Sequence, residues 1–209
     1  MAFPTTNAAE ELPAVNEILA SVGQAPVTTL DQTNPDVAIA YDTLTNVSRE
    51  VQAEGWTFNR EEYVKFTPDD TTKEITIPNN ILQIDLHDEV DNEYEAVRRS
   101  GKLYEKFNHT FEWDTDKWSN GVRCNVVYFY DWVDLPRPIQ DYIVARAASI
   151  VSSRIVGDTN QYSILQQKEQ YNRAMALEYE CNQGDYTIFG HGRGKKPYNS
   201  YKPYQALYR

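Results

Sequence analysis

The densest set of chemically capable side chains is a run of carboxylates in the middle of the chain. Asp88, Glu89, Asp91, Glu93 and Glu95 are close together in sequence, and such a run suits a hard cation or acid/base catalysis. The run lacks the glycine of an EF-hand loop and a final Glu at the offset for bidentate coordination. We therefore expect a solvated acidic loop at a turn and strand edge, and we keep an enzyme that uses these carboxylates as a distant alternative.

The histidines and cysteines give no stronger signal. His87, His109 and His191 are far apart, and none has the spacing of a metal-binding motif. Cys124 and Cys181 are isolated from each other and from any nearby histidine, which favours reduced, buried thiols. We therefore predict no metal site, no cofactor and no nucleophilic catalysis by a cysteine.

A glycine-rich segment near the C-terminus resembles a phosphate-binding loop only superficially. Residues 190–196 read GHGRGKK, which does not match the spacing of a phosphate loop. Pro197 follows where the helix of such a loop begins. No Gly-x-Ser-x-Gly nucleophile motif is present in the sequence either. The chain is therefore predicted not to be an enzyme.

Charge divides the chain into an acidic body and a basic end. The net charge is −11, but residues 1–185 hold 15 basic and 31 acidic side chains, a net of −16. An acidic body repels phosphates, which argues against tight wrapping of nucleic acid. Hydrophobic residues make up 41% of the chain, enough for a core without disulfides. The first residues lack a signal-peptide pattern and no long apolar run occurs, so we expect a soluble protein that does not enter a membrane.

The basic end, residues 185–209, has no helical spacing and is expected to be an extended arm. Lysines among tyrosines suit either a single nucleic-acid strand or a protein surface. The acidic body favours the protein-binding interpretation, with a neighbouring subunit as one candidate. The predicted partner-binding residues are Arg193, Lys195, Lys196, Tyr198, Tyr201, Lys202, Tyr204 and Tyr208.

Four helices are predicted to hold these segments. Apolar residues recur at helical spacing from Leu12 to Val22, with Pro13 in the first turn and Gly23 as the stop. Asn34-Pro35-Asp36 gives a cap and start for a helix that runs to Gly55. A third helix carries Ile139, Ile143, Ala147, Ile150 and Val151, and a fourth has Ile164, Leu165, Tyr171, Met175 and Tyr179 as its apolar side.

Between the second and third helices the periodicity changes to that of strands. The alternating pairs and triplets are Trp56 and Phe58, Ile75 and Ile77, and Leu82, Ile84 and Leu86. Ser100-Gly101 and Asn120-Gly121 are turn signals, the second followed by Val122, Cys124, Val126, Tyr128 and Tyr130 on one face. The predicted class is α+β: a four-helix-type bundle of residues 8–55 and 134–184, with five or six antiparallel strands inserted at residues 56–133.

Three stretches, in order and spacing, resemble the tail tubular protein A family. They are ELPAVNEILASVG followed by QAPVTTL (residues 11–30), QAEGWTFN (residues 52–59) and LPRPIQDYIVARA (residues 135–147). They are similar to the family patterns AVN-ILASIG-PPV-TL, Q-(R)GW-FN and P-x-x-(F/I)-x-x-(Y/W)-I-x-x-(R/K)-A. The likeness covers about residues 8–182, while the strand region and the basic end match poorly.

The resemblance implies a structural virion protein. Members of this family of short-tailed phages resemble head-completion adaptors: a helical bundle with a β insertion forms a twelve-fold ring whose lumen passes genomic DNA. The helical part is expected to face the portal protein and the β part the tail nozzle, tail tubular protein B, with tail fibres near the junction. The expected location is the virion tail, after assembly in the host cytoplasm. A head–tail connector of another tail type, or a nucleic-acid-binding module acting through residues 185–209, remains the alternative.

Overall fold

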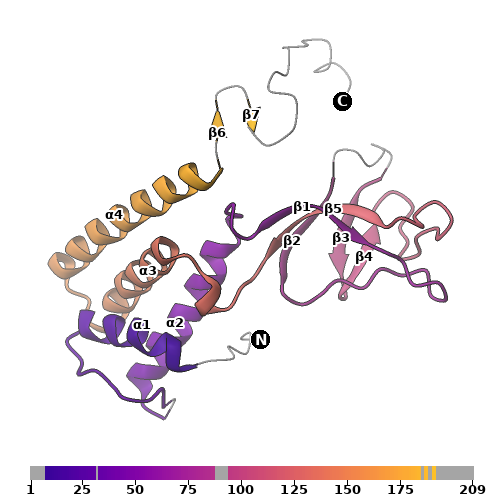
Figure 1. Cartoon of the computed structure of the whole chain (residues 1–209). Coiled ribbons are helices and arrows are strands. Elements are labelled where there is room, and N and C mark those ends of the chain that lie inside the picture. Colours follow the sequence, from indigo (N-terminus) through magenta and orange to yellow (C-terminus); the bar gives the residue numbers. More distant parts are fainter. Residues whose placement is uncertain (1–7, 32, 88–93, 185, 188–189, 192–209) are drawn as a thin grey trace.

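The computed structural model describes residues 8–31, 33–87, 94–184, 186–187 and 190–191 (Figure 1). Within them, four helices accompany small antiparallel sheets, a mixed architecture that agrees with the predicted α+β class. The helices are α1 (Ala8–Ser21), α2 (Pro35–Gln52), α3 (Arg137–Ile155) and α4 (Thr159–Gly184), with a short 3₁₀ helix η1 (Trp132–Asp134). The strands are β1 (Arg60–Phe66), β2 (Ile81–Leu86), β3 (Ala96–Arg99), β4 (Lys102–Glu105), β5 (Val122–Tyr128), β6 (Tyr186–Thr187) and β7 (Gly190–His191).

The first turns of α2 and α4 are capped by side chains that precede them in the sequence. The Asn34 side chain accepts a hydrogen bond from the Asp36 backbone N–H at 3.1 Å, and Pro35 is the first helical residue, as predicted. Asp158 accepts one from the backbone N–H of Asn160 at 3.0 Å before α4. These local contacts satisfy N–H groups that a helix start leaves without a partner.

The first helix begins earlier than predicted. It starts at Ala8, so Pro13 lies inside α1 and not in its first turn. Pro13 is exposed, and its ring nitrogen carries no N–H, so α1 lacks one backbone hydrogen bond at this point. The predicted stop at Gly23 is confirmed by its positive φ of 77°.

Helix α3 is the centre of the helical part, because α1, α2 and α4 all pack against it (Figure 1). Its predicted apolar stripe is confirmed: four of the five residues are buried and Ile150 is half-buried against the same cluster. The shared core contains Val15, Ile18 and Leu19 of α1, Val37, Leu44, Val47 and Val51 of α2, and Ile139, Ile143, Ala147 and Val151 of α3. Burial of these side chains contributes about 1.5–3 kcal/mol each to folding.

Helix α4 departs from the sequence prediction in which side it buries. Of its described side chains only Ala176 is buried, and Ile164, Tyr171 and Met175 are exposed. Leu165, with Glu169 and Asn172, lies on the side toward α3. The apolar periodicity predicted the helix, and Leu165 and Tyr179 of its apolar side are half-buried. The other three residues of that side are exposed, because Glu169 and Asn172 occupy positions that bond to α3.

The strands form a three-stranded antiparallel sheet in the order β1-β5-β2 and a separate β3–β4 hairpin. Ser100 and Gly101 both have positive φ, 50° and 74°, which suits the predicted two-residue hairpin turn. Two predicted strands are wrong. Trp56 and Phe58 lie in turns before β1, and Ile75 and Ile77 are buried in a segment that makes isolated bridges only.

The β region has its own apolar cluster. Val122, Cys124 and Val126 of β5 are buried on one face, as predicted, with Ile75, Ile77 and Trp113 packed around them. Tyr130 follows the end of β5 and packs on the helical cluster instead. The helical and β parts therefore meet near Tyr130.

Candidate functional site

Two fully buried amide side chains join the helical part to the sheet. Gln52, the last residue of α2, donates to the Tyr130 carbonyl at 3.1 Å and accepts from the Tyr130 N–H at 2.8 Å. Asn59 donates to the carbonyls of Gln52 and Tyr128, both at 2.8 Å, and accepts from the Trp56 N–H at 2.9 Å. Gln52 ties the end of α2 to the backbone of Tyr130, and Asn59 bonds to backbone groups of both parts, so the connection resists bending.

Helix α4 is attached to the same junction. The Glu180 carboxylate accepts from the Thr57 N–H at 3.0 and 2.9 Å and from the Thr57 hydroxyl at 2.6 Å. The Trp56 indole N–H donates to the Val51 carbonyl at 2.6 Å and its ring is buried. The ends of α2 and α4, the end of β5 and the start of β1 thus converge on residues 52–59, the second of the motif stretches.

Half-buried aromatic rings cover one side of this junction. Phe58 and Tyr128 lie 6.4 and 6.1 Å from the Tyr130 ring, measured between centroids. The Tyr130 hydroxyl donates to Glu61 at 3.4 Å. Burial raises the pKa of Tyr130 above its usual value and the Glu61 carboxylate raises it further, so this phenol stays protonated and serves as a hydrogen-bond donor at neutral pH.

The first motif stretch has an equally direct structural role. Asn16 of α1 donates to the Val27 carbonyl at 2.9 Å and accepts from the Val27 N–H at 2.8 Å. This pair of bonds holds the 24–30 segment against α1, as a strand partner would.

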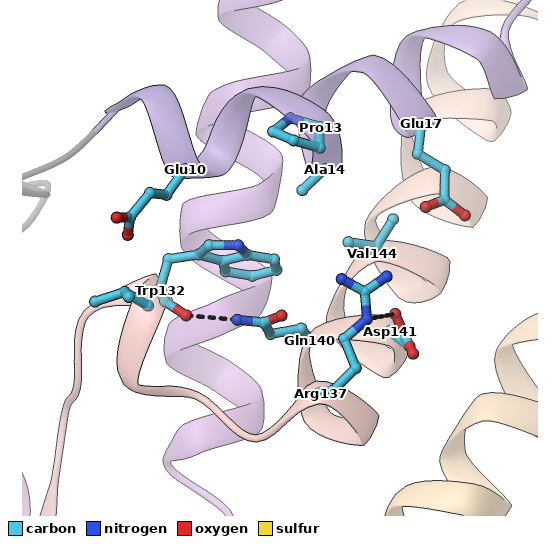
Figure 2. Close-up of a pocket in the computed structure, with 10 residues that line it drawn as sticks. Glu10, Pro13, Ala14, Glu17, Trp132, Arg137, Gln140, Asp141 and Val144 are labelled. Carbon is cyan, nitrogen blue, oxygen red and sulfur yellow. Dashed lines mark hydrogen bonds and ion pairs between the residues drawn. The ribbon is translucent and has the colours of Figure 1, made fainter.

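A hollow opens between α1, η1 and the first half of α3 (Figure 2). Its volume is about 310 Å³, and Figure 2 shows the Trp132 ring on its floor below Pro13 and Ala14. Gln140 holds Trp132 by donating to its carbonyl at 2.7 Å. The other lining residues are Glu10, Glu17, Val133, Arg137, Asp141 and Val144, which give it an apolar base and a charged rim.

Helix α4 borders this hollow. Lys168 pairs with Glu17 at 2.7 Å, and the Asn172 amide donates to the Asp141 carbonyl at 3.2 Å. At about 100° per residue, Ile164, Tyr171 and Met175 lie on the same flank of α4 as Lys168. Tyr171 is 66% exposed and Ile164 67%. We call the hollow together with this flank the α1–α4 face; nothing in the sequence pattern separated it from the core.

The residues first considered for chemistry are dispersed. His87 is buried with its ring 3.9 Å from that of Tyr63, and His109 lies in the turn region after β4. Of the acidic run, residues 88–93 lie outside the described residues, and Glu95 pairs with Lys106 at 2.6 Å. Among the described residues, no cluster of three or more His, Cys, Asp or Glu side chains could hold a metal ion.

The two cysteines are both free thiols in very different environments. Cys124 is fully buried, and burial, aided by the Asp85 carboxylate, raises its pKa to about 12. Such a thiol is a poor nucleophile at neutral pH. Cys181 is exposed near the end of α4, so the prediction of a buried thiol is wrong at this position, because its side of α4 faces away from α3.

The predicted partner-binding residues all lie outside the described residues, as does residue 185. The structure therefore neither brings together nor separates Arg193, Lys195, Lys196, Tyr198, Tyr201, Lys202, Tyr204 and Tyr208. Within the part of the chain that is described, no helix is long and apolar enough to cross a membrane.

Comparison with known proteins assigns the family. The family model described as tail tubular protein matches residues 12–186, a span that contains the second and third motif stretches, the first from its second residue onward, the junction, and all of the α1–α4 face except Glu10. The chain belongs to the tail tubular protein family, a structural and non-enzymatic class, and is a structural protein of a phage tail. Among curated proteins it is similar to tail tubular protein A of Klebsiella phage KP34, 26% identical over 175 residues, which cover 83% of this chain and 88% of that protein.

Proposed function

We propose that this chain is the tail adaptor: a ring, expected to have twelve copies, that joins the portal to the tail nozzle and forms part of the DNA-ejection conduit. The observation that carries the proposal is the junction built by Gln52 and Asn59. A part that links two unlike rings must hold its two binding regions in a fixed relation. Buried, fully paired amides between α2, Tyr128 and Tyr130 supply that stiffness.

In this proposal each region has its own partner. The helices of residues 8–55 and 134–184 form a bundle that docks on the portal, and the β insertion, residues 56–133, meets the nozzle. Tail fibres attach near the junction, and residues 185–209 act as a protein-binding arm. The net charge of −11 suits a conduit wall, because an acidic surface does not retain DNA that passes through it.

Ordered reconstitution tests the proposal. Purified portal, this chain and nozzle protein are mixed pairwise and together, and complexes are separated by sedimentation and imaged by negative stain. We expect this chain to bind the portal alone, and the nozzle to join only portal that already holds this chain. Nozzle binding to bare portal, or tight binding of this chain to single-stranded DNA without portal binding, would contradict the adaptor role.

A further inference from the structure

The α1–α4 face is an unusual surface for a protein of this charge. It joins an apolar hollow with three exposed apolar side chains on one flank of α4. Its ion pairs are internal: Lys168 with Glu17 at 2.7 Å and Arg137 with Asp141 at 2.9 Å. With Lys168 counted, the face holds three carboxylates, Glu10, Glu17 and Asp141, against two cations, Arg137 and Lys168, a net charge of −1. A ligand that suits the face therefore has bulky apolar or aromatic groups and positive charges.

One segment of this chain has that composition. Residues 192–209 contain five Lys and Arg and no acid, with tyrosines at 198, 201, 204 and 208. The hollow, of about 310 Å³, is larger than the cavity of about 150 Å³ that holds a benzene molecule, so it has room for an aromatic ring. Tyrosine is also among the residue types enriched where protein surfaces meet, since it combines a large apolar ring with a hydroxyl.

Chain length permits the segment to reach the face of its own molecule. From Gly184 back to Asn172, at the edge of the hollow, is about 18 Å along α4. Residues 192–204 span at most roughly 45 Å when extended. A tether of this length gives its own chain a local concentration on the order of millimolar, above that of other copies in a dilute solution.

We propose that residues 192–209 bind the α1–α4 face of the same chain, with a tyrosine ring in the hollow against Trp132 and Pro13 and lysines at the Glu10 and Asp141 rim. This deepens the proposed function, on which it rests, by naming the surface that the C-terminal arm occupies. Tyr171 and Met175 contact the arm along the flank of α4. The adaptor subunit carries its arm on its own helices before assembly.

Carbodiimide coupling of lysines to carboxylates tests the contact in the full-length protein. An equal mixture of ¹⁴N- and ¹⁵N-labelled chains is coupled at low concentration and the joined peptides are identified by mass spectrometry. We expect Lys195, Lys196 or Lys202 to couple to Glu10 or Asp141. Both halves of each joined peptide should carry the same nitrogen isotope, which shows that they come from one chain. The Lys168–Glu17 pair, 2.7 Å apart within one chain, serves as the internal standard.

A matched pair of variants tests the role of the α4 flank. Tyr171→Ser removes the proposed aromatic contact without adding a carboxylate beside Lys168, and should cut the arm-to-rim yield about tenfold, leaving the Lys168–Glu17 yield unchanged. Phe107→Ser, at an exposed aromatic of similar exposure in the β region, 59% against 66%, should change neither yield. An unchanged arm yield in Tyr171→Ser would overturn the proposal.

The remaining outcomes are also decisive. Mixed-isotope peptides would show that the arm binds another copy, and coupling elsewhere on the chain would show a different surface; either result overturns the proposal. Portal docking without coupling at this face would remove only this inference. Coupling at the face without portal docking would instead remove the adaptor function and leave the arm site standing.

Discussion

Replacing Asn59 tests the junction most sharply, because one small side chain makes three hydrogen bonds there. Asn59→Ala leaves the Tyr128 carbonyl and the Trp56 N–H without this partner in a buried position. At about 1 kcal/mol for each bond, the free energy of unfolding should fall by roughly 3 kcal/mol. For a chain of this size that corresponds to a melting temperature lower by about 9 °C.

The assay is denaturant and thermal unfolding followed by circular dichroism, with two companion variants. Asn59→Asp keeps the shape and the acceptor but loses both donors and buries a charge, so it should be at least as destabilised as Asn59→Ala. Asn79→Ala removes an exposed amide that accepts one bond from Arg98 at 3.0 Å, and should lose less than about 1 kcal/mol. Equal stability of the Asn59 and Asn79 variants would refute the view that the junction is a rigid connection.

Three further predictions concern the first motif, a glycine and the buried thiol. Asn16→Ala should cost about 1–2 kcal/mol and speed amide hydrogen exchange of residues 24–30, whereas the exposed Asn182→Ala should alter neither. Gly121→Ala should lower the free energy of unfolding by about 2 kcal/mol and Gly101→Ala by about 1 kcal/mol, as measured by thermal melting. The backbone angle φ is positive at both glycines, 82° and 74°, but of the two only Gly121 has neighbours, Lys65 and the Phe66 carbonyl, that a Cβ would crowd. Equal losses in the two variants would contradict this. Burial raises the pKa of Cys124 to about 12 in the folded chain, against an ordinary 9.0, so the thiol ionises first in the unfolded chain. Between pH 9 and 12 the free energy of unfolding should therefore fall, relative to that of Cys124→Ala, by up to about 1.4 kcal/mol per pH unit. A difference between the two proteins that is independent of pH would show that the thiol is not shielded.

The sequence predicted the elements whose signals are local. Asn34-Pro35-Asp36 contains its own cap, start and first-turn acid, and Ser100-Gly101 carries the backbone conformation of its turn, so neither depended on distant contacts. The α1, α2 and α3 stripes were recovered because each faces a single core.

The errors arose where tertiary contacts decide the outcome. Trp56 and Phe58 alternate like strand residues, but the Asn59 and Trp56 side chains bond to nearby backbone and hold a turn there. On α4, Ile164, Tyr171 and Met175 lie outward, because Glu169 and Asn172 hydrogen-bond to α3 at positions that face it. Periodicity alone gives no way to separate a buried face from an exposed apolar one.

The junction residues could be predicted in part from the sequence, whereas the α1–α4 face could not. Gln52 and Asn59 belong to a stretch that the family resemblance marked, but the hydrogen bonds of their side-chain amides join residues up to 78 positions apart. Apart from the resemblance, the one feature of the sequence that pointed to this junction was a glutamine on the apolar side of a helix. The α1–α4 face needed the packing of three helices and η1 before it could be recognised at all.

The most direct test of the central claim is the mass that the chain adds to the portal. Mass photometry of portal rings, before and after addition of excess protein, counts the copies that bind. The adaptor account predicts a saturating increase equal to twelve chains of 24.1 kDa. No increase, or a gradual increase without a saturating ring, would contradict it.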